Sequence, residues 1–164
     1  MALMRLSARV DYALRATTEL AAAQLAAVAA DGPGATAALI TAERIATAQA
    51  IPAKFLESIL VQLRRAGIVS AQRGPEGGYW LARPAAEISL ADIIRVIDGP
   101  LTYIRSTRPE DLGYQGVARP LQDVWIALRA SEREILEMVT VADVASGEMP
   151  ERVQKLIADP KAWE

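Results

Sequence analysis

One stretch, residues 41–83, constrains the fold of this chain more than any other: TAERIATAQAIPAKFLESILVQLRRAGIVSAQRGPEGGYWLAR. Thr41 is a suitable N-cap for a short helix over residues 42–49, because its hydroxyl can accept a hydrogen bond from a free backbone N–H. A turn at Ala50 and Ile51 follows. A second helix then begins, with Pro52 at the first helical position, where proline is best tolerated.

The second helix has one apolar face and one polar face. Gly67 ends it, as a C-terminal glycine commonly does. The apolar residues recur at helical spacing, which predicts a buried face; they are Phe55, Leu56, Ile59, Leu60 and Leu63. The polar face offers Lys54, Glu57, Ser58, Gln62, Arg64 and Arg65.

A β-hairpin follows the second helix. Residues 69–72 and 79–81 are short strand-like runs, and the glycine-rich loop 73–78 joins them. Helix, turn, helix and β-wing in this order predict a winged helix-turn-helix DNA-binding domain. The alternative is a small helical domain with an incidental hairpin.

Composition restricts the function classes. Of the 164 residues, 52% are hydrophobic and only 5% aromatic, which favours a mainly α fold with a small β-wing. The absence of cysteine excludes disulfides and thiolate metal sites, and the absence of histidine removes the usual general base. We therefore expect no enzyme activity. With no signal-peptide layout and no long apolar run, we expect a cytoplasmic protein without membrane association.

Charge is unevenly distributed along the chain. The net charge is −2, yet residues 1–83 carry nine Lys/Arg against six Asp/Glu, and residues 84–164 carry nine against fourteen. This asymmetry indicates a DNA-facing N-terminal part and an acidic remainder.

The flanking segments divide the chain into four parts: a winged-helix domain over 1–84, a short helix and loop over 85–119, a dimerisation helix over 120–146 and a polar tail over 147–164. Ser7 caps a first helix that runs to about Ala30, and the arginines near its start, Arg5, Arg9 and Arg15, suit phosphate contacts. A further short helix over 91–97 begins near Ser89 or Leu90. The helix that Pro120 opens has an apolar stripe too wide for a solitary helix, so we expect a homodimer. Packing on the first helix alone is the alternative.

The run 51–84, together with residues 4–7 and 11–15, resembles the Rrf2 family of bacterial transcription regulators, which includes an iron–sulphur cluster regulator, a nitric-oxide-sensing repressor and a cysteine-metabolism repressor. The resemblance covers about Met4 to Ala145, and its most specific part is the wing sequence RGPEGGY. It implies a winged helix that binds a double-stranded DNA operator as a homodimer.

By this resemblance, Lys54 and Glu57 lie where family members contact bases; Lys54 can donate to guanine and Glu57 can accept from cytosine. Arg73, beside Gly74 on the wing, suits an A·T minor groove. Phe55 suits either the core or a thymine methyl. The expected DNA-contacting set is Arg5, Ser7, Thr41, Pro52, Ala53, Lys54, Phe55, Glu57, Arg64, Arg73 and Gly74.

The chain departs from the family at the sensor. Many relatives hold an iron–sulphur cluster with three cysteines; here Ser106, Gly113 and Arg119 fall at or near those slots. Asp11 matches a position that supplies a carboxylate ligand in the nitric-oxide sensor, and Gln122 matches a histidine of another relative. We therefore expect no cofactor and no metal. An effector, if there is one, is a protein or a small molecule near Asp11, Tyr103, Tyr114 and Trp125.

These observations predict a sequence-specific, homodimeric transcription repressor without a cluster. The rival is a winged-helix protein-interaction module that has lost DNA binding, and Lys54, Glu57 and Arg73 favour DNA. The sequence does not identify the operator, the regulated genes or the effector.

Overall fold

Hydrogen bonds to side chains cap the first turns of several helices in the N-terminal part of the chain. The computed structural model describes residues 6–100 and 107–164, so the expectations for Arg5, Tyr103 and Ser106 lie outside the described residues. The helices and strands are α1 Ala8–Asp31, α2 Ala42–Gln49, α3 Ala53–Arg65, β1 Val69–Gln72, β2 Gly78–Leu81, α4 Leu90–Asp98, α5 Leu121–Met138, α6 Val141–Ser146 and α7 Glu151–Ile157, with short 3-10 turns η1 Ala85–Glu87, η2 Pro109–Asp111, η3 Gly116–Ala118 and η4 Pro160–Trp163.

The predicted caps are confirmed. The Ser7 hydroxyl accepts from the Val10 N–H at 3.1 Å, and the Thr41 hydroxyl accepts from the Arg44 N–H. Ser89 caps α4 in a reciprocal capping box with Asp92. Each cap satisfies backbone N–H groups that the first helical turn leaves without partners.

The ends of α3 differ slightly from the prediction. Pro52 is the N-cap and not the first helical residue, because its backbone is extended (φ −60°, ψ 128°) and its carbonyl accepts from the N–H groups of Phe55 and Leu56. At the other end, the N–H of Gly67 donates to the carbonyl of Arg64, and the N–H of Ile68 donates to that of Leu63. This paired arrangement is the usual glycine-assisted end of a helix.

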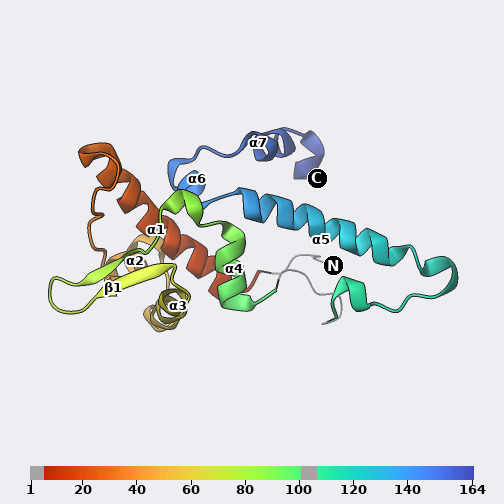
Figure 1. Cartoon of the computed structure of the whole chain (residues 1–164), viewed down its shortest axis with the longest axis horizontal. Helices are drawn as coiled ribbons and strands as arrows, with labels where there is room; N and C mark the ends of the chain where they lie inside the picture. The colour runs from red at the N-terminus through yellow and green to blue at the C-terminus, as the bar shows by residue number, and fades with distance from the viewer. Residues whose placement is uncertain (1–5, 101–106) are drawn as a thin grey trace.

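The core lies between α1 and the elements that surround it. α1 contacts α2, α3, α4, α6 and β2, and Figure 1 shows it running through the middle of the winged-helix body. The largest fully buried side chains are Leu20, Ile45, Leu56, Ile59, Leu60, Leu63, Ile68, Ile88, Ile93, Val10, Val69 and Val141. The apolar face of α3 therefore packs inside the chain as its spacing predicts, except at Phe55, which is exposed.

The wing is an antiparallel hairpin that a third segment extends. β1 pairs with β2 so that Val69 lies opposite Leu81 and Gln72 opposite Gly78. Ile40 forms an additional antiparallel bridge with Tyr79, with N···O distances of 3.0 and 2.8 Å. A Cβ at Gly78 would come within 3.0 Å of the Ile40 backbone, so glycine permits this close crossing.

The prediction of one continuous helix over residues 120–146 is wrong. α5 ends at Met138, and α6 begins at Val141 after a break at Val139 and Thr140. The cause is a backbone bridge between Ser89 and Thr140: the Leu90 N–H donates to the Val139 carbonyl, and the Val141 N–H donates to the Ile88 carbonyl. α6 then packs on α1. In Figure 1, α5 extends away from the winged-helix body like an arm.

The C-terminal residues are helical, although we expected only a polar tail. α7 follows Pro150, and the turn η4 follows Asp159. Within residues 6–100 and 107–164, no helix is both long and apolar enough to cross a membrane.

Candidate nucleic-acid interface

The N-terminal half of α3 presents an exposed surface of mixed chemistry. The residues expected to contact bases are all exposed there: Pro52, Ala53, Lys54, Phe55 and Glu57. Phe55 is 37% exposed, so the core role that its spacing allowed is not the one the structure gives it. The ammonium group of Lys54 lies 5.4 Å from the centre of the Phe55 ring, a cation–π contact.

Contacts from α1 hold this surface in place. Arg9 donates to the Ser58 hydroxyl at 2.8 Å and to the Gln62 side-chain oxygen at 2.5 Å. The Tyr12 ring lies 6.0 Å from the Phe55 ring. Arg9 was expected to contact a phosphate, but its guanidinium instead binds α3 and orients it. Sequence reasoning missed this role, because no local pattern pairs residues about fifty positions apart.

The wing carries Arg73 on an exposed loop. Arg73, Gly74, Pro75 and Glu76 are all exposed. Gly74 has φ +107°, a backbone conformation that L side chains rarely adopt. Its part is thus to shape the loop that presents Arg73, and it brings no side chain of its own.

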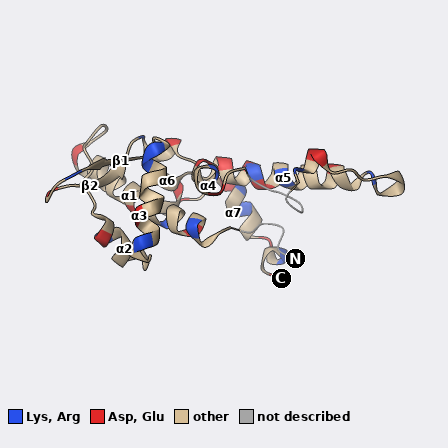
Figure 2. Ribbon diagram, turned by 90° about the horizontal axis from the view of Figure 1, so that it is seen from below, with Lys and Arg blue, Asp and Glu red and all other residues tan. Residues whose placement is uncertain are grey.

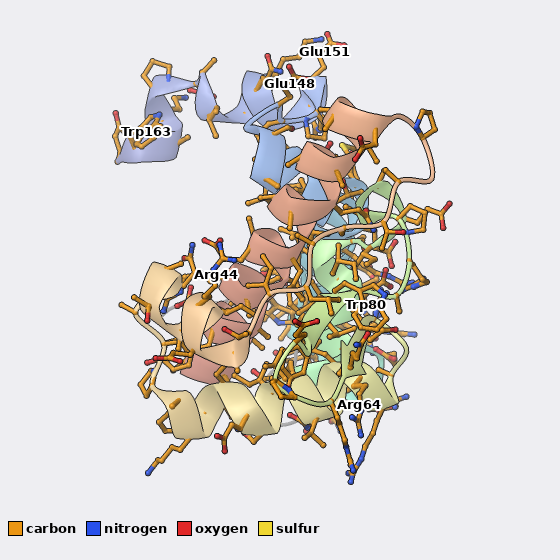
Figure 3. All side chains as sticks on the ribbon, turned by 90° about the vertical axis from the view of Figure 1, so that its left-hand side faces the viewer. Arg44, Arg64, Trp80, Glu148, Glu151 and Trp163 are labelled. Atoms are coloured by element: carbon orange, nitrogen blue, oxygen red, sulfur yellow. The ribbon has the colours of Figure 1, made fainter. Side chains whose placement is uncertain are left out.

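Arg64 and Arg65 occupy the last turn of α3 and are exposed. In Figure 3, Arg64 points outward at one end of the molecule, while Glu148 and Glu151 lie at the opposite end. Figure 2 shows basic positions on α3, whereas α5 carries both acidic and basic ones, with the acidic residues in excess. The charge asymmetry along the sequence thus becomes an asymmetry in space.

Two residues that were expected to contact DNA also cap helices. The hydroxyl of Ser7 caps α1 and donates to a carboxylate oxygen of Asp98 at 2.8 Å. Thr41 is exposed and caps α2. Ser7 is already engaged on both sides, so its side chain has less capacity for a phosphate than that of Thr41.

Of the four residues expected near an effector, the three that the structure describes lie in two places. The Trp125 indole N–H donates to the Tyr114 hydroxyl at 2.9 Å, which joins α5 to the segment before it. Asp11 instead forms an ion pair with Arg15 at 2.7 Å on α1.

The residues at the sensor position do not fit an iron–sulphur cluster. Such clusters are held mainly by cysteine thiolates, which histidine replaces in some centres, and the chain has neither residue. Gln122 donates its amide to the carbonyls of Pro109 and Glu110, so it fastens the turn η2 to α5. In the described part of the chain, no cluster of three or more potential metal-binding residues occurs.

An ion pair reinforces the same turn. Arg129 contacts the Glu110 carboxylate at 2.5 Å. The pKa of Glu110 is lowered first by a backbone hydrogen bond and then by the hydrogen bond from Arg129. The polar side chains of this region are thus used to hold the loop against α5.

Comparison with known proteins agrees with this geometry. The family model Rrf2, described as an iron-dependent transcriptional regulator, matches residues 6–147. The chain is 47% identical over 161 residues to a Mycobacterium tuberculosis protein with the name HTH-type transcriptional regulator Rv1287, covering 98% of this chain and 93% of that one. It is 32% identical to the HTH-type transcriptional regulator IscR of Cereibacter sphaeroides, covering 89% and 90% of the two chains.

A solved structure has the same fold. CymR, the global cysteine regulator of Bacillus subtilis, superposes with a TM-score of 0.68 at 30% identity, covering 88% of this chain and 98% of that one. A match across most of the sequence and a shared fold lead to one conclusion: this chain belongs to the Rrf2 family and is a DNA-binding, winged-helix transcription regulator.

Proposed function

We propose that the protein is a homodimeric repressor that reads its operator with α3 and the wing and works without an iron–sulphur cluster. The observation that carries this proposal is the division of α3 into two faces. Leu56, Ile59, Leu60 and Leu63 are fully buried, while Lys54 and Glu57 are exposed beside them. A helix fixed in this way presents a rigid edge to the major groove.

The wing supplies a second contact. Arg73 stands on a loop whose backbone is held by the hairpin, so it can enter the minor groove next to the site that α3 reads. A narrow A·T minor groove attracts arginine through its negative potential. We expect operator half-sites to carry an A·T-rich flank on the wing side.

Dimerisation is supported by α5. None of its residues is buried, although it carries a stripe of large apolar side chains. A second copy of the chain related by a two-fold axis would cover this stripe on both helices at once. Two winged helices placed symmetrically would then read two half-sites.

Selection from random duplex DNA tests the readout. We expect the wild type to recover a palindromic motif with A·T-rich flanks and Arg73→Ala to lose the preference for those flanks. Arg152→Ala, which changes an exposed arginine of α7 at the far end of the molecule, is the matched control. Transcription from a template that carries the recovered motif should fall when the protein is added. Failure to recover any motif would contradict the proposal, as would transcription that rises.

Anaerobic purification tests the absence of a cluster. The chain lacks the ligands that a cluster requires, so we expect colourless protein and operator affinity that survives chelation. Stoichiometric iron, or affinity that chelation removes and metal restores, would overturn this part.

A further inference from the structure

A small hollow lies between four helices of the winged-helix body. It has a volume of about 290 Å³ and is lined by Leu14, Arg15, Thr18, Gln49, Leu90 and Val144. These residues come from α1, α2, α4 and α6. Ligand pockets combine apolar walls with a few convergent polar groups, and this hollow has that composition.

Arg15 gives the hollow a cation with donors to spare. Its guanidinium donates to the Gln49 carbonyl at 2.5 Å and to the Asp11 carboxylate at 2.7 Å. Its Nε–H is buried and has no hydrogen-bond partner. A guanidinium carries five N–H donors, so these bonds leave a capacity that an incoming anion can use. The Asp11 side of the pair is 58% exposed, and ion pairs in contact with water contribute little, so another anion can replace Asp11 at small cost.

Arg15 also contacts the parts of the molecule that present α3. Gln49 is the last residue of α2, and the next residue, Ala50, has a left-handed backbone at the turn into α3. The bond from Arg15 therefore holds the carbonyl at the end of α2, where a positive charge is favourable. Any ligand that draws Arg15 away loosens this turn.

A second connection between Arg15 and α3 runs through two aromatic rings. The Arg15 guanidinium lies 5.0 Å from the centre of the Tyr12 ring, and the Tyr12 ring packs against Phe55, which the Lys54 ammonium covers in turn. One continuous row of contacts thus joins the hollow to the lysine that we propose reads a base. Such a row is a physical path by which the hollow and the DNA-facing surface can be coupled.

We propose that the hollow is an effector site for a small organic acid with an apolar body, whose carboxylate binds Arg15 and whose binding weakens the affinity for DNA. The carboxylate matches the spare donors of Arg15, and Leu14, Leu90 and Val144 match an apolar body. A volume of about 290 Å³ holds about ten non-hydrogen atoms at the ~30 Å³ that a water molecule occupies in the liquid. This inference rests on the proposed operator binding and adds its regulation.

Hexanoate is the probe for the binding step. Calorimetry on the DNA-free full chain should show hexanoate binding at least about tenfold more tightly than hexanol, which lacks the charge, and more tightly than acetate or inorganic phosphate, which lack the body. Hexanol as tight as hexanoate would overturn the role of Arg15. If acetate or inorganic phosphate binds as tightly as hexanoate, the proposed apolar part of the site would be overturned.

Two variants locate the site. Val144→Phe fills the hollow and keeps Arg15, so it should abolish hexanoate binding while operator affinity in the absence of acid stays within about twofold. Arg15→Gln should also lose hexanoate, provided that its helicity is unchanged. Arg133→Gln alters an exposed arginine of α5 outside the hollow and should bind hexanoate as the wild type does. Unchanged binding to Val144→Phe would overturn the assignment.

The coupling is tested in both directions. Saturating hexanoate should weaken operator binding by about 5- to 150-fold, and saturating operator must weaken hexanoate binding by the same factor, because linkage is reciprocal. Hexanoate that binds without changing DNA affinity would overturn the effector role. If the protein binds no operator in the absence of hexanoate, the proposed function is contradicted instead. Calorimetry on the DNA-free protein would still test whether hexanoate binds in the hollow.

Discussion

Helices α3 and α5 are both amphipathic, yet they use their apolar faces differently. α3 has 13 residues and buries Leu56, Ile59, Leu60 and Leu63. α5 has 18 residues and buries none. The difference arises because α3 packs on α1, α4 and β1, whereas α5 contacts mainly α4 and η2. An apolar stripe in a sequence thus shows that a partner is needed without showing whether that partner lies in the same chain.

The exposed apolar residues of α5 show how α5 differs from α3. Val124 is 53% exposed and Leu121 is 42% exposed. Single exposed apolar side chains are common on protein surfaces, but a stripe along a projecting helix marks an interaction site. We therefore treat α3 as stabilised within the chain and α5 as stabilised by a second copy, and the following predictions test that contrast.

The largest effect should come from the buried face of α3. Leu60→Ala removes a side chain that is only 1% exposed, and it should lower the free energy of unfolding by about 2–5 kcal/mol through lost burial and the cavity left behind. Val61→Ala, at the neighbouring position that is 41% exposed, should change it by less than about 0.5 kcal/mol. Urea unfolding of the two variants checks this. Equal effects would mean that α3 is not anchored by its inner face.

The second-largest effect should be on the association of two copies of the chain. Val124→Asp places a charge in the proposed interface and should weaken the dimer by about 10- to 100-fold, or about 1.4–2.8 kcal/mol. Light scattering at micromolar concentration should report twice 17.6 kDa for the wild type and a lower mass for the variant. Ala130→Asp, an exposed residue on the other side of α5, is the control. A wild-type monomer with intact helices would contradict the proposal.

Local chemistry explains what the sequence predicted well. Ser7, Thr41 and Ser89 cap their helices through hydrogen bonds that span three residues, so the residue types alone indicate where the helices start. The wing was also predictable, because two short strand-like runs and the glycine-rich loop between them are local signals.

The missed features depend on contacts between distant residues. Val139 and Val141 continue the apolar pattern of α5, so periodicity hides the break that the Ser89–Thr140 bridge imposes. One signal was available: Thr140 and Asp143 have the spacing of a capping box, which the structure forms. At the site, exposure of Lys54 and Glu57 followed from helical spacing. The contacts of Arg9 and Arg15 with other elements followed from no pattern in the sequence.

A smaller effect concerns the outer face of α3. Lys54→Ala should flatten base preference at one position of each half-site by about 1 kcal/mol, the lower end of the range for base-reading pairs, because lysine donates as a single point. Arg133→Ala removes a charge from α5 and should leave base preference unchanged. Selection from random duplexes with both variants makes the measurement. If Lys54→Ala returns the wild-type motif with equal sharpness, α3 does not read DNA through this residue.

Where α3 is fastened by apolar side chains, the end of α5 is fastened to α4 by charges. Glu137 on α5 accepts hydrogen bonds from Arg133, at 2.9 Å, and from Arg95 on α4. The hydrogen bond from Arg133, followed by that from Arg95, lowers the pKa of Glu137 below its ordinary value of 4.5. A carboxylate with a lowered pKa in the folded state adds stability above its unfolded pKa and loses it as the pH falls through the folded pKa.

The effect of Glu137→Gln should therefore be the smallest of the four, and its size should depend on pH. Near neutral pH the variant should be slightly less stable than the wild type, and the difference should vanish as the pH falls from 4.5 through the lowered pKa. Because both partners are substantially exposed, added salt should shrink the difference as well. Glu134→Gln, whose ion pair with Arg152 is longer at 3.5 Å, should show a weaker change. Urea unfolding at a series of pH values provides the measurement, and a difference that grows toward low pH would show that the charges do not hold α5 to α4.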